Sequence, residues 1–497
     1  MSNRRRPSAA NPYLWAFTIY FAEGFPYTIF RTISSVFFRD RGMSLESIGL
    51  TSLFGLPWVV KFLWSPQVDQ FGTKRQWLLI TQAVLVVIIL AAALAAPLPW
   101  AIPLIVALFM AGSFVAATHD VAIDGYYLEA LDTAGQSRFI GYRVMAYRIA
   151  MMSGTGIIVT IGTTMGWPLA FGIAGLLMAG LFLFHRAGLP HCESARQPLA
   201  VMARGLCVPK RLGYATAAAL GLAGLRLAIE SPVYQEWQRR LPLLGHLNFP
   251  AWIGILLFLA LLAILAGRRR IHAWIASRPE SYYASAFVSF MDREGTGAVI
   301  AFIILIRTGE FMLSSMTAPF LVDLGLKTHY GWISGGLGLP CSIIGAMFGG
   351  WLIARYGLKK MIWPFLLAQN CTNLVYMGLA WRLTGYLAVN TGNPAPHPLG
   401  LANLLTVAAV HGFDQFAGGL GTAVLMTYLM RICGQEFKAA HYAIGSGLMS
   451  MSGLYAGMIS GFLAAWLGYG GFFGLSFLLS LPGMATVFLL PNLEQRP

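Results

Sequence analysis

The chain has 497 residues, of which 57% are hydrophobic and only 11% are charged. A soluble domain carries roughly 25% charged residues, so most of the surface of this protein does not face water. Hydrophobic runs of about 18–25 residues recur along the sequence, and this length crosses a bilayer as a helix. The short alternating segments of a membrane β-barrel do not occur. The composition therefore excludes a soluble protein and predicts an all-α membrane protein.

The charge balance is explained by membrane topology. Lys and Arg number 34 against 19 Asp and Glu, a formal net charge of +15. Cytoplasmic loops of membrane proteins are enriched in Lys and Arg, so the excess does not call for a nucleic-acid partner. The 5 cysteines show no paired spacing, and no phosphate loop follows a strand, so no metal site and no cofactor is expected. The segment MSNRRRPSAANPY leads into an apolar run without a cleavage site, which favours a retained first helix.

Fourteen membrane-spanning helices are predicted in chain order. Six precede a central linker, at 12–37, 45–64, 77–97, 101–128, 138–162 and 167–185, and six follow it, at 298–322, 330–354, 361–384, 400–431, 438–465 and 469–490. The linker, 186–297, holds a further pair at 213–230 and 249–267. Both members of this pair span or neither does, because a single crossing would invert every later basic loop. The strongly apolar second member favours both. The basic loops then lie on one side, with both termini in the cytoplasm.

The segment HDVAIDGYYLE, residues 119–129, closes an apolar run with two acids. Asp120 and Asp124 are four residues apart, so they lie on one face of a helix. Two carboxylates close together in a low dielectric do not both ionise easily, and a carboxylate that gains and loses a proton is what a proton-coupled carrier needs. The alternative is a structural ion pair with Arg143 or Arg148 on the next helix. The sequence leaves both possibilities open.

Three further acids lie in other apolar segments: Glu23, Glu310 and Asp414. A charge near the bilayer centre costs roughly 2.5–3.5 kcal/mol on insertion scales, so these acids are expected to face a protein interior. Arg307 precedes Glu310 by three residues and is within helical pairing distance. His411 and Asp414 have the same spacing and are possible partners.

A set of basic, aromatic and amide side chains forms the candidate substrate site. Arginine offers a bidentate fork to carboxylate or phosphate, so an arginine-lined cavity predicts an anionic small-molecule substrate. Tyrosines can stack on sugar faces, although packing explains each one as well. The candidate residues are Arg31, Arg143, Arg148, Arg307, Tyr27, Tyr147, Gln369 and Asn373. Lys61 is expected to extend its ammonium group towards the membrane surface.

The chain repeats a short loop pattern. Asp69, Gly72, Lys74 and Arg75 follow the second predicted helix, and Gly357 and Lys359 follow its counterpart in the second half, where Ala354 replaces the acid. Two six-helix halves related by repetition are a common plan for transporters. These residues are therefore candidates for a loop that moves during a change of conformation.

The loop pattern resembles the signature of the major facilitator superfamily. Closer similarity to AmpG-type muropeptide permeases comes from FAEGFP at 21–26, KFLWSP at 61–66, His119 with Asp120 and Asp124, Arg307 with Glu310, and Asp414 with GGLGT at 418–422. The same group includes acetyl-CoA transporters and some siderophore permeases. The resemblance implies a major facilitator fold with halves 1–185 and 298–497, in which helices 1, 4, 7 and 10 line a central cavity.

The resemblance also implies a function. It indicates a secondary active transporter in the bacterial inner membrane that imports anhydro-muropeptides together with protons, using Asp120, Asp124, Glu23, Glu310 and Asp414 for proton coupling. Its expected partners are the substrate, protons and the lipid bilayer, and it is expected to be a monomer. The alternative substrates are a siderophore or an acetyl-CoA-like anion.

Two alternatives of a different class remain. An intramembrane enzyme with a magnesium-binding DxxxD motif would need a second Asp-rich motif, which the second half lacks. A transporter-like sensor is compatible with the same sequence. The prediction is a transporter and not an enzyme.

Overall fold

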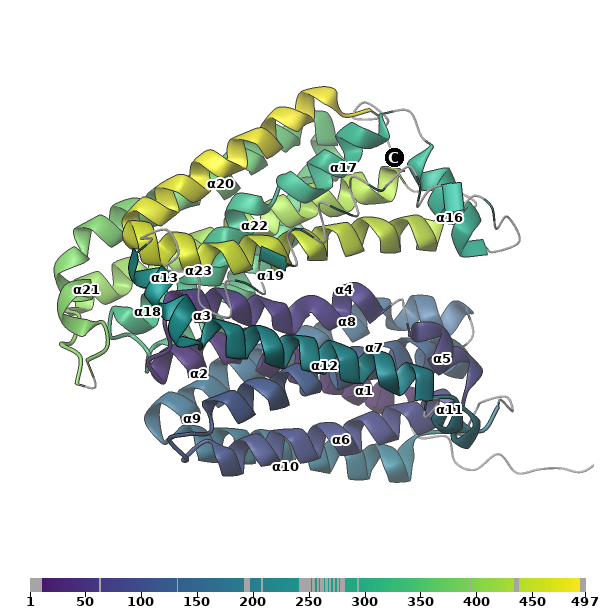
Figure 1. Cartoon of the computed structure of the whole chain (residues 1–497). Coiled ribbons are helices and arrows are strands. Elements are labelled where there is room, and N and C mark those ends of the chain that lie inside the picture. Colours follow the sequence, from purple (N-terminus) through teal and green to yellow (C-terminus); the bar gives the residue numbers. More distant parts are fainter. Residues whose placement is uncertain are drawn as a thin grey trace, which may run out of the picture.

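The computed structural model describes residues 11–491, with gaps at 62–63, 132, 192–196, 207–208, 293–294, 394 and 433–437 and with only scattered residues of 241–281. Every regular element in this part of the chain is a helix, which confirms the all-α prediction. Figure 1 shows two bundles of helices lying one above the other, with the purple-to-blue first half below and the green-to-yellow second half above.

The described part of the first bundle contains six helical passes, each made of one helix or of consecutive helical segments. They are α1 (Pro12–Thr28) with η1 (Ile29–Ile33) and α2 (Ser34–Asp40); α3 (Leu45–Leu50) with η2 (Thr51–Gly55) and α4 (Leu56–Val60); α6 (Lys74–Ala95); α7 (Ile102–Ala130); α8 (Thr133–Met152) with η4 (Ser153–Ile158) and α9 (Val159–Thr164); and α10 (Trp167–Gly188). The short α5 (Ser65–Gln70) lies in the loop after the second pass. Each predicted span before the linker thus corresponds to one pass.

The second bundle follows the same order. Its passes are α17 (Thr296–Leu305) with α18 (Thr308–Asp323), η6 (Gly331–Gly338) with α19 (Leu339–Tyr356), α20 (Leu358–Arg382), α22 (Leu401–Ile432), and α23 (Lys438–Ala485) with η7 (Thr486–Leu489). The small α21 (Thr384–Asn390) follows α20. The run α23 covers two predicted spans, because Gly468 adopts φ +67° and turns the chain between them.

The linker contains α11 (Leu199–Leu206), α12 (Pro209–Ile229), α13 (Pro232–Arg240) and α16 (Tyr282–Met291). The predicted span 213–230 corresponds to α12, whereas the predicted span 249–267 lies outside the described residues. Seven helices within the described residues are long and apolar enough to cross a bilayer, and α12 is not among them. The division at 185 and 297 stays a prediction.

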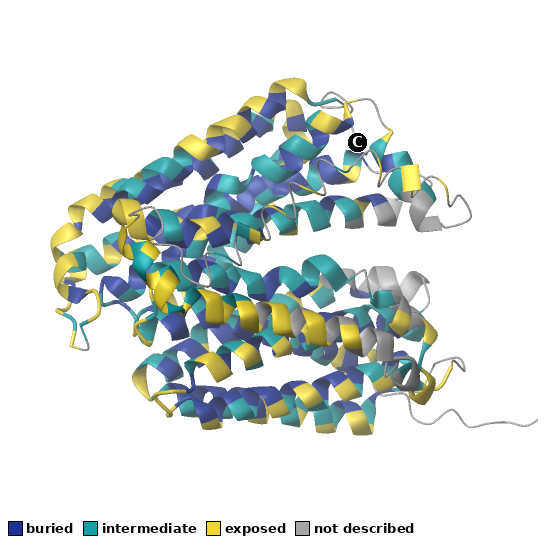
Figure 2. Cartoon of the chain, viewed as in Figure 1, coloured by how far each residue is buried: buried dark blue, intermediate teal, exposed yellow. Residues whose placement is uncertain are grey.

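Burial follows the pattern of a membrane protein. Large apolar side chains such as Leu94 and Trp466 are exposed on outer faces, at 78% and 75%, where lipid would cover them. The interior of the first bundle is packed with aromatic rings, including Phe37 against Phe109 and Phe171. Figure 2 shows the exposed residues in yellow along the outside of both bundles, with buried residues in blue between the helices.

The two halves cross where glycines remove side chains from the interface. A Cβ added to Gly335 in η6 would lie 2.5 Å from the backbone N of Gly156 in η4. A Cβ added to Gly461 in α23 would lie 2.1 Å from the backbone O of Leu45 in α3. Small residues allow such close helix approach inside a membrane. These two crossings hold the halves together at one end of the molecule.

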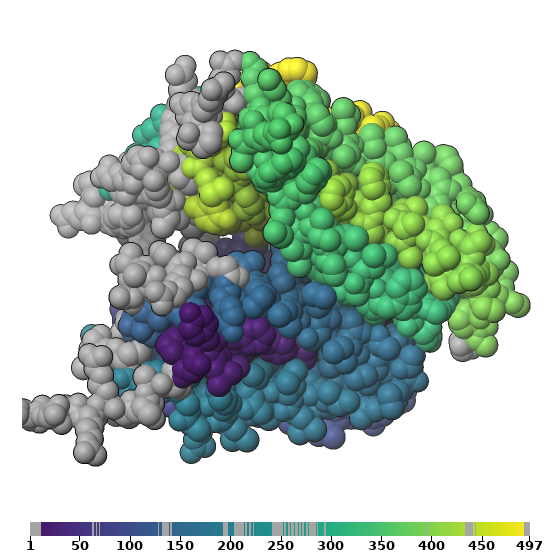
Figure 3. Space-filling model, turned by 180° about the vertical axis from the view of Figure 1, so that it is seen from behind, coloured from purple at the N-terminus to yellow at the C-terminus, as the bar shows by residue number. Residues whose placement is uncertain are grey.

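Two ion pairs between the halves lie at the same end, here called the closed end. Arg39 of α2 binds Asp323 of α18 with both Nε and Nη2, at 2.7 and 2.5 Å. Lys327, after α18, donates to Asp40 at 2.8 Å. In Figure 3 the blue and green halves meet at this end, and the surface is hollowed between them towards the other end.

Candidate functional site

A cavity of about 360 Å³ opens between α1 and α8 in the first half. Its lining residues are Tyr20, Glu23, Tyr27, Arg143, Val144, Tyr147, Arg148 and Met151. The two helices approach closely at Gly24, where a Cβ would lie 2.8 Å from the backbone O of Tyr147. Five of the predicted site residues therefore line one cavity.

Asp124 is held by two neighbours at this cavity. The hydroxyl of Tyr20 donates to its Oδ1 at 3.0 Å, and Nη2 of Arg143 lies 3.2 Å from the same oxygen. The guanidinium of Arg143 also lies over the rings of Tyr20 and Tyr127, with its carbon 4.5 and 5.3 Å from the ring centroids. The ion-pair alternative for Asp124 is thus realised, with Arg143 as the partner. The carboxylate keeps 43% of its side-chain surface exposed, so it remains open to exchange with water.

Asp120 has a different partner although it lies on the same helix face. Its Oδ2 forms an ion pair with Nζ of Lys61, and its side chain is only 10% exposed. The prediction that Lys61 extends to the membrane surface is therefore wrong. The carboxylate of Asp120 holds the ammonium group inside the bundle, because a buried charge is strongly destabilised unless an opposite charge lies beside it.

Glu23 completes an acidic group. Its carboxyl group lies beside that of Asp120. Its Oε2 is buried and has no hydrogen-bond partner. Two neighbouring carboxylates in a low dielectric do not both ionise easily, so one proton on the pair is favoured. The proton neutralises one acid, Lys61 balances the other, and the pair adds no net charge to the cavity.

Arg148 differs from the other cations at this site. Within the described part of the chain it forms no ion pair with a carboxylate, while Arg143 and Lys61 each have one. It lines the cavity beside Tyr147. With the other charges balanced, Arg148 gives the cavity a net positive charge that suits an anionic group.

Two predicted tyrosines lie at this cavity and Arg31 does not. Tyr27 contacts Trp58 edge to face, with ring centroids 5.0 Å apart, and lies 6.0 Å from Tyr147. Arg31 instead donates to the backbone O of Ser52 at 2.8 Å and packs against Gly55, where a Cβ would lie 2.5 Å from its Nη1. Arg31 therefore joins the first two passes and lies away from the cavity lining.

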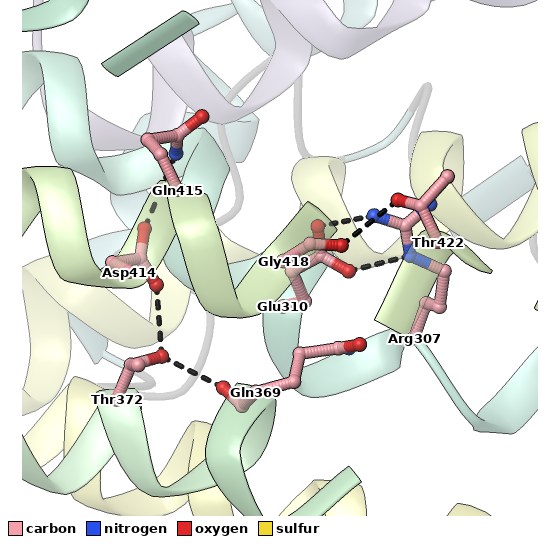
Figure 4. A network of polar contacts seen from close by, with 8 residues as sticks. All are labelled: Arg307, Glu310, Gln369, Thr372, Asp414, Gln415, Gly418 and Thr422. Carbon is pink, nitrogen blue, oxygen red and sulfur yellow. Dashed lines mark hydrogen bonds and ion pairs between the residues drawn. The ribbon is translucent and has the colours of Figure 1, made fainter. Parts of the chain in front are cut away.

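The acids of the second half form a separate network (Figure 4). Arg307 and Glu310 form a bidentate ion pair, as their spacing predicts. Asp414 accepts from Thr372 Oγ1 at 2.8 Å and from Gln415 Nε2 at 3.2 Å. The five predicted acids thus fall into two groups, one in each half.

The hydroxyl group of Thr372 links Asp414 to the backbone of α20. The hydroxyl of Thr372 has one hydrogen but two acceptor neighbours, the backbone O of Gln369 at 2.7 Å and Asp414 Oδ1 at 2.8 Å. Thr372 is the donor in both contacts, so its one hydrogen is shared between the two acceptors. His411 does not pair with Asp414, since its ring nitrogens contact Tyr376 and Ser334.

The amides of α20 have unequal surroundings. Asn373 is satisfied, because it donates to the backbone O of Asn370 at 3.0 Å and accepts from Ser476 at 2.6 Å. Gln369 is 1% exposed, and neither its Oε1 nor its Nε2 has a partner. Oδ1 of Asn370 is also buried and unpartnered.

The loop pattern after the second pass is fixed by backbone contacts. Gly72 has φ +63°, and its N–H donates to the backbone O of Gln197 at 2.7 Å. Lys74 donates to the backbone O of Val68 at 3.1 Å, and Arg75 donates to the backbone O of Arg186 at 2.7 Å.

In the second copy of this pattern Gly357 has φ +86° and Lys359 is exposed. The side chain of Asp69 lies outside the described residues. A conformational role for either loop remains a prediction.

Sequence reasoning missed the pairing of Lys61 with Asp120 and the unpaired amide of Asn370. No local pattern indicates either one, because the first joins residues 59 apart and the second depends on packing. The contact between Tyr20 and Asp124 had a partial signal, since Tyr20 lies three residues before Glu23 on one helix face.

Comparison with known proteins supports a transporter. The anhydromuropeptide permease of Escherichia coli (strain K12) is 23% identical over 480 residues, which cover 94% of this chain and 77% of that protein. Putative transporter AmpG 4 of Rickettsia felis is 21% identical over 485 residues and 95% of each chain. A crystal structure of the peptide transporter POT in complex with sulfate matches with a TM-score of 0.61 at 14% identity, over 96% of this chain and 94% of that one. No family model matches the sequence.

These findings confirm the resemblance to AmpG-type permeases and the major facilitator fold. The relatives carry the names of permeases and transporters, which also confirms the prediction of a transporter in place of an enzyme. The chain is a multi-pass membrane protein that transports a small molecule.

Proposed function

We propose that the chain is a proton-coupled importer of anhydro-muropeptides in the bacterial inner membrane, with both termini in the cytoplasm. The observation that carries this proposal is the cavity between α1 and α8, where the uncompensated cation Arg148 lies beside the proton-sharing acid Glu23. A peptide carboxylate of a muropeptide supplies the anion that Arg148 needs, and tyrosines in the same lining suit a sugar face. The name of the Escherichia coli relative, an anhydromuropeptide permease, supports this substrate class.

Coupling follows from the charge balance. The pair of Glu23 and Asp120 holds one proton, and Asp124 lies open to water one helical turn away. An arriving anion neutralises Arg148, and a proton that enters with it restores the original charge of the cavity, so each favours the binding of the other. A proton gradient directed into the cell thereby drives uptake of the anion.

Uptake into proteoliposomes tests the proposal. Purified protein is exposed to an anhydro-muropeptide, to a ferri-siderophore and to acetyl-CoA, with the external solution more acidic than the lumen. The anhydro-muropeptide is expected to accumulate, and a protonophore is expected to abolish the accumulation. Equal uptake with and without the gradient would contradict proton coupling, and selective uptake of another probe would replace the proposed substrate.

A further inference from the structure

The seventh membrane pass is interrupted at the polar network of the second half. α17 ends at Leu305 and α18 begins at Thr308, and Arg307 between them has φ −106° and ψ 8°. The hydroxyls of Thr308 and Ser452 both donate to the backbone O of Ile304, so they satisfy a carbonyl freed by the break. Interrupted helices near the bilayer midplane commonly build the binding sites of transporters.

The unpaired carboxamides lie next to this interruption. Gln369 has two unpartnered polar atoms, and Asn370 has one. A Cβ on Gly309, in the first turn of α18, would lie 3.3 Å from Oδ1 of Asn370. Buried polar groups in native proteins are almost always hydrogen-bonded, so three unpaired atoms on neighbouring residues require an explanation. A ligand that supplies the missing hydrogen-bond partners explains these three atoms.

Glycines of α22 form a cradle for these side chains. A Cβ on Gly421 would lie 1.3 Å from Oε1 of Gln369, and a Cβ on Gly418 would lie 3.1 Å from Oε1 of Glu310. Polar groups from α18 and α20 therefore converge on the bare backbone of α22. Figure 4 shows Gln369 extending below Glu310 towards Arg307, with Gly418 on the facing helix.

We propose that Gln369, with the pair of Arg307 and Glu310, forms a second subsite that binds an acetamido group of the substrate, which is a secondary amide. A carboxamide matches this group, because its Oε1 accepts from the amide N–H and its Nε2 donates to the amide oxygen. Gln369 is shielded in the conformation described, so binding requires α18 and α22 to separate at the glycines. The inference rests on the proposed function and adds that the second half recognises an uncharged group.

Two probes test this subsite in uptake by the full chain. One is an anhydro-muropeptide, and the other is the same molecule with each acetamido group replaced by hydroxyl. The variant Gln369→Leu is expected to raise the KM of the first probe about tenfold and to leave the KM of the second unchanged, since it removes one donor and one acceptor. Cys371→Ser, at an exposed position of the same helix, is the control and should affect neither probe.

The thermal stability of Gln369→Leu distinguishes a role of Gln369 in substrate binding from a role in packing. Removing a buried amide that has no partner relieves a desolvation cost, so Gln369→Leu is expected to raise the Tm of the purified protein while it weakens uptake. A lowered Tm, or an equal loss for both probes, would overturn the subsite while leaving the proposed function intact. Failure of the wild type to take up either probe would overturn both proposals.

Discussion

At the scale of single residues, the neighbouring carboxyl groups of Glu23 and Asp120 give the clearest test of proton coupling. Glu23→Gln keeps the size and polarity of the side chain but cannot exchange a proton. It is expected to abolish accumulation against a gradient and to preserve exchange of substrate between the two sides, because exchange needs no net proton movement. Uptake under a pH gradient and counterflow without one measure the two activities.

The control for this variant is Glu230→Gln, in an exposed ion pair of the linker, which should retain both activities. Asp124→Asn is likewise expected to abolish proton-driven uptake, since it removes the exposed acid next to the pair. Accumulation by Glu23→Gln at the wild-type level, with unchanged pH dependence, would contradict the role of Glu23.

The uncompensated charge of Arg148 predicts how the substrate is held. Hydrogen bonds to charged groups contribute roughly 1.5–3 kcal/mol, and each 1.4 kcal/mol is a factor of about ten in affinity. Arg148→Ala is therefore expected to raise the KM for an anionic substrate by about 10- to 100-fold. Arg355→Ala, an exposed arginine stacked on Trp351, is the matched control. A carboxamide analogue of the substrate should bind equally well to wild type and Arg148→Ala, and a parallel loss would argue against a direct contact.

At the scale of helices, hydrophobic run length was enough to predict where the helical passes lie that the structure describes outside the linker. It gave no indication of the breaks within them, because a change from α-helix to π-helix at η4 or η6, or the interruption at Arg307, leaves the hydropathy of the segment unchanged. The same limit applies to the site. The pair of Arg307 and Glu310 follows from local spacing, whereas the pair of Lys61 and Asp120 depends on how separate helices pack.

The crossing of η4 and η6 can be tested with two adjacent glycines. A Cβ on Gly335 would meet the backbone of Gly156 at 2.5 Å, whereas one on Gly336 would have only Trp332 within 4 Å, at 3.8 Å. Overpacking typically costs about 1–3 kcal/mol. Gly335→Ala is therefore expected to lower the Tm and the uptake rate. Gly336→Ala should match or slightly exceed the wild-type Tm, because alanine favours a helix by about 0.5–1 kcal/mol. Equal effects of the two variants on the Tm and on the uptake rate would show that the close approach of η4 and η6 at Gly335 is not needed for stability or transport.

At the scale of the whole molecule, the two halves provide different chemistry around one interface. The first half holds the proton-sharing acids and Arg148, and the second holds the glycine cradle with its unpaired amides. A substrate that has an anionic end and an amide-bearing end would contact both halves at once. Such a substrate links them more strongly than either of its ends alone, and this is how binding energy can drive their relative movement.

The closed end carries the charges that oppose this movement. Asp323 accepts from Arg39 and also from the hydroxyl of Tyr469 at 2.6 Å, and its side chain is only 4% exposed. Breaking a buried ion pair from one side costs about 3–5 kcal/mol, because the remaining charge stays unpaired. Asp323→Arg is therefore expected to part the halves at this end, and combining it with Arg39→Asp should restore closure by re-forming the pair in reverse.

Spin labels at Ser44 and Thr391, one in each half, report this opening in a cysteine-free background. Asp323→Arg should lengthen the distance between the labels, and the double variant should shorten it again. Arg226→Asp, which reverses a charge in an exposed linker pair, should leave it unchanged. If the single variant gives the wild-type distance, then the glycine crossings and the pair of Lys327 and Asp40 keep this end closed without the pair of Arg39 and Asp323.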